Sequence, residues 1–206
     1  VLERSGYVSF ANCGLPYYLG REIENYDDLI LQTPQSLGAR FNLDVRVGHE
    51  VRSIDREKRE VTVANLSDDS EFRLSYDELI LSVGAKPIVP PIPGLKRDGI
   101  FTLRNMEDTA AIDAWVEEKS PKQVVVVGGG YVGIEVAEQF HHRGMKVSII
   151  DAASQILPPL DQEMAELAHA KVREMGMALY LQSPLKEIVD GGGLVGDVRA
   201  GDHEIA

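Results

Sequence analysis

The feature that most constrains the fold is a glycine-rich stretch directly after an apolar run. Residues 123–127 are a glutamine and four valines, and Gly128–Gly133 (GGGYVG) follows at once with the pattern Gly-x-Gly-x-x-Gly. A helical pattern then runs to Gly144, and a second apolar run leads to Asp151, 23 residues after the first glycine. A short continuous apolar strand is typical of a parallel sheet buried on both faces. The complete order of strand, glycines, helix and acid predicts a dinucleotide-binding unit.

The spacing gives each residue of this unit an expected role. Gly128 permits a tight turn, Gly130 lets a pyrophosphate approach the backbone at the helix N-terminus, and Gly133 lets the helix pack close to the strand. Asp151 is expected to accept a hydrogen bond from the adenosine ribose. The residues at 152–154 are Ala, Ala and Ser, with no arginine for a 2′-phosphate, so NADH is favoured over NADPH.

Composition excludes several classes of partner. The formal net charge of -12 argues against nucleic acid, because a phosphate backbone selects a basic surface. No apolar run approaches the roughly 20 residues of a membrane span. One cysteine in 206 residues cannot form an intramolecular disulfide, and no spaced cluster of ligands indicates a metal site. We therefore expect a cytoplasmic protein that acts on a small molecule.

The single cysteine, Cys13, is the candidate reactive atom. It lies in the segment SFANCGLPYY, and Pro16 suits the first turn of a helix beginning just after the thiol. A helix N-terminus favours the thiolate, which is the nucleophilic form. The alternative is a buried free cysteine acting as a small hydrophobe, which composition alone favours.

Ser9-Phe10-x-x-Cys13, continued as Gly-Leu-Pro-Tyr-Tyr, resembles the active-site segment of single-cysteine flavoprotein disulfide reductases. The likeness is to the coenzyme A-disulfide and NADH-dependent persulfide reductases in particular. The resemblance implies that electrons pass from NAD(P)H through FAD to a low-molecular-weight disulfide or persulfide at Cys13. It also implies a homodimer for the full-length protein. Cys13 has no partner cysteine in this chain, so it would pair with the substrate sulfur or form a sulfenic acid.

The resemblance also implies further cofactor contacts. Glu3 matches the acid that holds the FAD ribose, although such a residue is also common at a solvated strand end. Residues 82–87 resemble a second FAD motif, Thr-x-Gly-x-x-Pro, with serine in place of threonine; the alternative is a strand followed by a proline-rich linker. Tyr131 and Glu135 match residues beside the flavin and nicotinamide, or else are an exposed aromatic and a surface charge. The predicted cofactor-binding residues are Glu3, Arg4, Ser9, Val51, Ser82, Gly84, Gly128, Gly130, Tyr131, Val132, Gly133, Glu135 and Asp151.

Two other functions stay open. One is an NADH oxidase or peroxidase that cycles Cys13 through sulfenic acid; in those relatives Gly-Met usually follows the cysteine, so residues 15–18 (LPYY) favour the thiol substrate. The other is a non-catalytic nucleotide-binding module or redox sensor. The non-catalytic module fits this piece of chain taken alone, because the first FAD glycine motif is missing from it. We expect the isolated piece to have no turnover.

The predicted fold class is α/β. Residues 1–105 are predicted to be an incomplete FAD-binding domain that carries Cys13, and residues 106–206 a Rossmann-like NAD(P)-binding domain that is truncated at its C-terminal end. The missing glycine turn before Glu3 indicates an internal piece of a longer protein. Alternating apolar residues from 44 to 74 predict an antiparallel meander, and residues 76–83 a buried strand. Helices are expected at 34–41, 108–118 and 161–174, the last two capped by Asp108 and Asp161.

Overall fold

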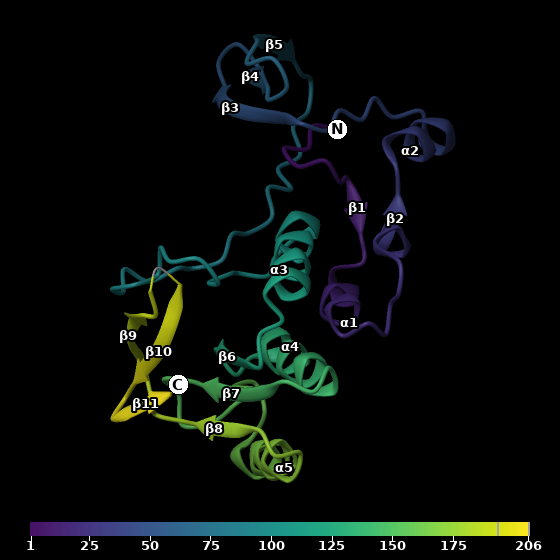
Figure 1. The fold of residues 1–206 in the computed structure, drawn as a ribbon. Helices are drawn as coiled ribbons and strands as arrows, with labels where there is room; N and C mark the ends of the chain where they lie inside the picture. Colours follow the sequence, from purple (N-terminus) through teal and green to yellow (C-terminus); the bar gives the residue numbers. More distant parts are fainter. Residues whose placement is uncertain (193, 206) are drawn as a thin grey trace. The chain divides into compact units, whose positions relative to one another are not determined.

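A computed structural model describes residues 1–192 and 194–205 and shows an α/β fold with one parallel sheet and several antiparallel ones. The elements are drawn in Figure 1, and the chain divides by its internal packing into two compact units. The first contains Val1–Asn12 and Tyr26–Lys86, and the second contains Cys13–Asn25 and Pro87–Ala206. The boundary predicted between an FAD-binding and an NAD(P)-binding domain stays a prediction.

An antiparallel meander forms the main sheet of the first unit. It consists of β3 (His49–Asp55), β4 (Glu60–Asn65) and β5 (Glu71–Ser75), in the order β3-β4-β5. Val61 pairs with Leu74 and Val63 with Phe72 across β4 and β5. Both valines are buried, as alternation in a strand with one covered face requires. The meander predicted from the apolar alternation is present.

The first unit also contains a two-stranded sheet and one helix. β1 (Ser9–Phe10) pairs with β2 (Ile30–Gln32), and α2 (Pro34–Phe41) follows β2. Thr33 caps α2: its hydroxyl accepts from the Ser36 amide at 3.1 Å, and the Ser36 hydroxyl accepts from the Thr33 amide at 2.9 Å. This reciprocal pair satisfies two amides that the helix leaves open. The predicted cap and helix limits are confirmed.

The strand predicted at residues 76–83 is not formed. Its segment has no regular structure, and Ile80 and Val83 are 87% and 89% exposed. The chain continues exposed at Ile88. An apolar run becomes a strand only where a neighbouring strand supplies hydrogen-bond partners, and none pairs with it among the described residues. The apolar start of the chain at residues 1–4, which is typical of the end of a strand, also forms no regular strand, since Leu2 makes only an isolated bridge to Arg46.

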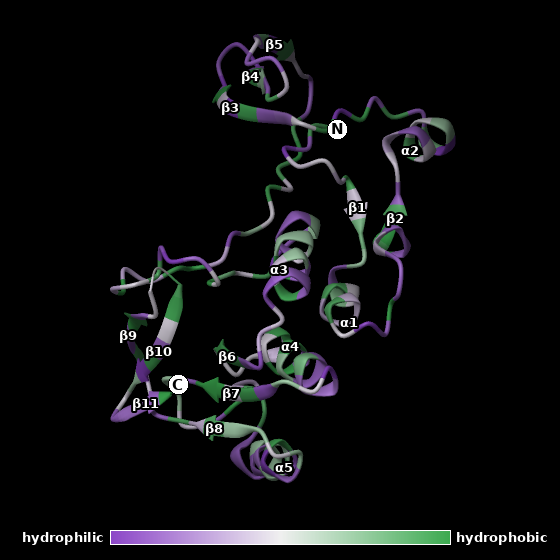
Figure 2. Cartoon of the chain, in the orientation of Figure 1, coloured by the Kyte–Doolittle hydropathy of each residue, from purple (hydrophilic) through white to green (hydrophobic). Residues whose placement is uncertain are grey.

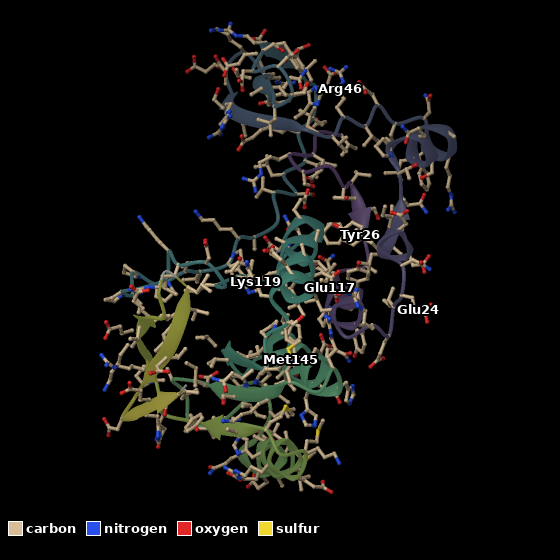
Figure 3. The ribbon with its side chains drawn as sticks, in the orientation of Figure 1. Glu24, Tyr26, Arg46, Glu117, Lys119 and Met145 are labelled. Carbon is tan, nitrogen blue, oxygen red and sulfur yellow. The ribbon has the colours of Figure 1, made fainter. Side chains whose placement is uncertain are left out.

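The second unit is built on the parallel sheet β6-β7-β8. Its strands are β6 (Gln123–Val127), β7 (Lys146–Ile150) and β8 (Ala178–Tyr180), with α4 (Tyr131–His142) and α5 (Gln162–Glu174) as crossovers. β7 is the central strand and is hydrophobic over most of its length (Figure 2). Val147 and Ile149 pack in one core with Phe140 of α4 and with Met145, labelled in Figure 3. The nucleotide-type unit predicted from the glycine pattern therefore has the expected order and direction of strands.

Further elements complete the second unit. These are α1 (Leu15–Leu19), α3 (Met106–Lys119), and the antiparallel strands β9 (Leu185–Asp190), β10 (Val195–Ala200) and β11 (His203–Ile205). The cap predicted for α3 was wrong. Asn105, rather than Asp108, accepts from the first turn, through the Asp108 amide at 2.9 Å. The side chain of Asp108 instead accepts from the Arg104 amide. The sequence Gly-Gly-Gly at 191–193 predicts a hairpin turn, and Gly193 lies outside the described residues.

A group of charged side chains joins α1 to α3 and α4. Arg143, at the C-terminal end of α4, donates to the Leu19 carbonyl of α1 at 3.0 Å and to Glu117 of α3 at 2.8 Å. Arg21 pairs with Glu117 at 2.6 Å and with Asp113 at 2.8 Å. Figure 3 labels Glu117 on α3. Hydrogen bonds from Arg21 first, and then Arg143, hold the pKa of Glu117 below its usual range. Three helices are thereby linked around two guanidinium groups.

Arg143→Met is expected to lower the free energy of unfolding by about 2 kcal/mol, because it leaves the Leu19 carbonyl without its donor and removes a largely buried guanidinium group. The side chain of Arg143 is only 15% exposed. Arg21→Met is the matched control and should cost less than about 1 kcal/mol, since Arg21 is more exposed. Denaturant unfolding followed by circular dichroism measures both values. Equal losses for the two variants would contradict the assigned difference.

Candidate functional site

The glycine turn between β6 and α4 has the geometry of a phosphate-binding loop. Gly128 has φ +111°, a left-handed conformation that favours glycine, and its amide donates to Ile150 at 2.8 Å. A Cβ on Gly133 would lie 2.0 Å from the Gly128 carbonyl oxygen, so helix and strand meet there at closest approach. A Cβ on Gly130 would meet nothing within 4 Å. The backbone at the start of α4 is therefore open to a ligand.

The N-terminus of α4 is suited to a negative charge. Gly130 is its N-cap residue, and no side chain supplies a capping hydrogen bond there. The first-turn amides of a helix have no partner within the helix, and they carry its positive dipole end. The apolar side chains of Val127, Tyr131 and Val132, around this turn, are all more than half exposed. The residues present thus fit a dinucleotide: amides for its pyrophosphate and apolar surface for its rings.

Asp151 organises the same loop. One of its carboxylate oxygens accepts from the Gly129 amide at 2.6 Å, and the other accepts from the Ala153 amide at 2.7 Å. Each oxygen retains capacity to accept one more hydrogen bond. Asp151 therefore shapes the glycine turn in addition to the ribose contact predicted for it, a role that its sequence position did not reveal.

Cys13 is an exposed free thiol in a 3-10 turn, Asn12–Gly14, directly before α1. Its exposure contradicts the alternative of a buried hydrophobe. Gly14 is the N-cap of α1, and Pro16 lies in the first turn of the helix, as predicted. Leu15 and Leu19 are buried in the second unit and hold α1 in place. The packing thus fixes the helix and leaves the sulfur accessible.

Tyr17 shows that the thiol segment and α4 lie close together. The carboxylate of Glu135 raises the pKa of the Tyr17 hydroxyl above its ordinary value. Burial and the charges of Glu138, Glu22 and Cys13 act in the same direction. Tyr17 is consequently a neutral O–H group at physiological pH. The charges of Glu135, predicted near the nicotinamide, and of Cys13, the predicted reactive thiol, therefore both reach this one hydroxyl of α1.

Of the predicted FAD contacts, three lie together at the start of the meander. The backbone of Glu3 bonds to Arg46 and His49, and its carboxylate accepts from the Ser5 amide at 2.7 Å. Arg4 lies 3.9 Å from Glu50, the residue before Val51 in β3, and Val51 is partly exposed. The Glu3 carboxylate could bind a ribose and the Val51 backbone an adenine, so these residues fit part of a flavin site.

The other predicted FAD contacts are less constrained. Ser9 lies in β1 and pairs with Gln32. Ser82 and Gly84 lie in the exposed irregular segment after β5, where Gly84 has φ +66°. A left-handed glycine suits a close backbone approach to a ligand. The described residues therefore fit some of the contacts predicted for a flavin.

Two other features are absent from residues 1–192 and 194–205. No group of three His, Cys, Asp or Glu side chains in these ranges could hold a metal ion. In the same ranges no helix has both the length and the apolar character needed to span a bilayer.

The glycine turn before α4 and an exposed thiol lie in one packed unit. A comparison with protein families identifies the family. Residues 1–205 match the pyridine nucleotide-disulphide oxidoreductase family, and the chain belongs to it. The resemblance drawn from the Cys13 and glycine motifs is confirmed at this level.

The relatives include both reductases and oxidases. The chain is 38% identical over 190 residues to a coenzyme A disulfide reductase of Staphylococcus haemolyticus, and 34% identical over 190 residues to an NADH oxidase of Methanocaldococcus jannaschii. Each match covers 92% of this chain and 42% of the relative, so the chain spans less than half of their length. A structure of reduced CoADR-RHD from Bacillus anthracis has a TM-score of 0.93 at 41% identity, over 97% of this chain and 35% of that one.

Proposed function

We propose that the protein carrying this chain is an FAD-dependent reductase that transfers electrons from NADH to a small disulfide or persulfide of the coenzyme A type through Cys13. The observation that carries the proposal is the exposed thiol of Cys13 at the start of α1, in the same packed unit as the dinucleotide loop. A thiol available to a dissolved substrate is what this chemistry requires.

The second unit would bind the NADH. The pyrophosphate would lie against the amides at the start of α4, where Gly130 leaves space, and Asp151 would accept from the adenosine ribose. Tyr131 and Glu135 follow in the first turns of α4 and would face the nicotinamide half. An anionic Asp151 followed by Ala152 disfavours a 2′-phosphate, which supports NADH over NADPH.

The first unit would contribute the flavin contacts. Glu3 and Arg4 would hold the ribose end, Ser9 and Val51 would contact the flavin nucleotide through their backbones, and Ser82 with Gly84 would form the second contact motif. When bound, FAD supplies a two-electron relay between the nicotinamide and sulfur.

The sulfur chemistry would take place at Cys13. Its thiolate attacks one sulfur of the substrate disulfide, a new S–S bond forms to Cys13, and the second sulfur leaves as a thiolate that takes a proton from water. Two electrons originating in NADH then cleave the mixed disulfide, which releases the second thiol and restores the Cys13 thiolate. Overall, NADH, one proton and one disulfide give NAD⁺ and two thiols. Tyr17 lies in α1, the short helix that follows Cys13, and its neutral hydroxyl would be a hydrogen-bond donor for this step.

An NADH oxidase or peroxidase is the second candidate, favoured by the 34% identity to a protein of that name. In that reaction Cys13 would cycle through a sulfenic acid. The third candidate is a nucleotide-binding module without turnover.

Anaerobic NADH oxidation separates these functions. The full-length protein that carries this sequence is expected to oxidise NADH with coenzyme A disulfide or a coenzyme A persulfide. It should do so much more slowly with oxygen or hydrogen peroxide. Faster turnover with oxygen or peroxide than with both sulfur substrates would transfer the protein to the oxidase class. No turnover in a preparation that retains flavin would favour the binding module.

A further inference from the structure

A buried histidine in α5 makes a hydrogen bond that the proposed chemistry does not use. His169 is 1% exposed, and its Nε2 accepts from the backbone N–H of Ile156 at 3.1 Å. Accepting this bond requires a lone pair on Nε2, so the neutral ring carries its proton on Nδ1. Nδ1 lies 3.3 Å from a carboxylate oxygen of Glu166, one turn earlier in α5. Nδ1 makes no hydrogen bond to this carboxylate, but the nearby negative charge favours a proton on Nδ1 and thus the acceptor at Nε2.

The residue held by His169 lies directly against the dinucleotide loop. Ile156 is fully buried, and its Cγ2 is 2.6 Å from the point where a Cβ on Gly129 would stand. The next amide, of Leu157, donates to the Gly129 carbonyl at 2.7 Å. Leu157 has φ +50°, which is uncommon for a residue other than glycine, so its conformation depends on the bonds around it.

Gly129 is thereby held on both sides. Its carbonyl accepts from Leu157, and its amide donates to the carboxylate of Asp151 at 2.6 Å. The segment from Asp151 to Leu157 therefore sets the position of the loop's central glycine. Within the described residues, the Ile156 amide donates to His169, a side chain from outside that segment.

We propose that His169 is a positioning residue for the dinucleotide. Its Nε2 keeps Ile156 and Leu157 behind Gly129, and this fixes the loop whose amides would receive the pyrophosphate. The inference rests on the proposed function, which gives the loop its coenzyme. It assigns a role to a residue outside the glycine pattern, 13 positions beyond the amide it holds. If His169 only filled space, an apolar side chain of similar length would replace it without changing the dissociation constant for NADH.

A matched pair of substitutions separates positioning from space filling. Glutamine and methionine have similar length, but glutamine offers a strong carbonyl acceptor near the former Nε2, whereas the methionine sulfur is only a weak acceptor. His169→Met leaves the buried Ile156 amide unpaired and is expected to raise the dissociation constant for NADH about tenfold. His169→Gln should stay within about threefold of wild type, because it restores the acceptor. Fluorescence titration of NADH on the full-length protein measures both constants, and steady-state kinetics should show a raised KM with kcat nearly unchanged.

Val116→Ala in α3 is the control for a general loss of stability. Val116 is buried in the same core but has no polar group for the loop. The Val116→Ala variant should have a lower unfolding temperature and an unchanged dissociation constant for NADH. The proposal is overturned if His169→Met binds NADH like wild type, or if methionine and glutamine weaken binding equally. Failure of the wild-type protein to bind NADH would instead refute the proposed function, which keeps the two failures distinct.

Discussion

Cys13→Ser is expected to lower the rate of NADH oxidation with coenzyme A disulfide by at least about a thousandfold. A serine hydroxyl stays protonated at neutral pH and cannot form the mixed disulfide, whereas the exposed thiol can. The side chains are nearly the same size, and Cys13 is not part of the core. Steady-state kinetics of the two proteins at equal flavin content measure the difference.

The Cys13→Ser variant should still bind NADH and still allow NADH to reduce the flavin. The dinucleotide loop and Asp151 contain no sulfur, so the dissociation constant for NADH should change by less than about threefold. Bleaching of the flavin absorbance by NADH under anaerobic conditions should also persist. Full turnover of Cys13→Ser with the disulfide would contradict the role given to this thiol.

Changing the acid at the end of β7 is expected to reverse the coenzyme preference. Asp151→Ala with Ala152→Arg removes a carboxylate that repels a 2′-phosphate and adds a guanidinium that can bind one. The ratio of kcat/KM for NADPH to that for NADH should rise at least about a hundredfold, which corresponds to roughly 2.7 kcal/mol. Part of the change will be a loss with NADH, because Asp151 also holds the Gly129 and Ala153 amides.

Asp161→Ala is the matched control for this charge change. Asp161 precedes α5, and its side chain makes no capping hydrogen bond. It should leave the NADPH to NADH ratio unchanged within about twofold. An unchanged ratio in the double variant would show that the coenzyme ribose does not lie at Asp151.

The sequence was sufficient where one local pattern determines the backbone. The βαβ unit followed from the valine strand, the glycines and Asp151, because each residue is required by a contact within the same short segment. The meander followed from apolar alternation, and α2 followed from Thr33 and Pro34. The start of α1 just after Cys13 followed from Pro16 in the first turn of that helix.

The sequence was insufficient where the local structure depends on a partner that is distant along the chain. Residues 76–83 contain a strand-like apolar run, yet a strand needs a neighbour that the described chain does not provide. The choice of Asn105 over Asp108 as the cap of α3 depended on the exact turn at which the helix begins. The effect of Glu135 on Tyr17, and the bond from His169 to Ile156, join elements with no common sequence pattern.

The central claim is that Cys13 itself carries the substrate sulfur. The most direct measurement is mass spectrometry of the Cys13 peptide after the full-length protein, reduced anaerobically with NADH, is mixed with coenzyme A disulfide. We predict one coenzyme A joined to Cys13 through a disulfide, and its release on further addition of NADH. An unmodified Cys13 after coenzyme A disulfide, together with a sulfenic acid trapped at Cys13 after peroxide, would contradict this function and assign the protein to the oxidase branch.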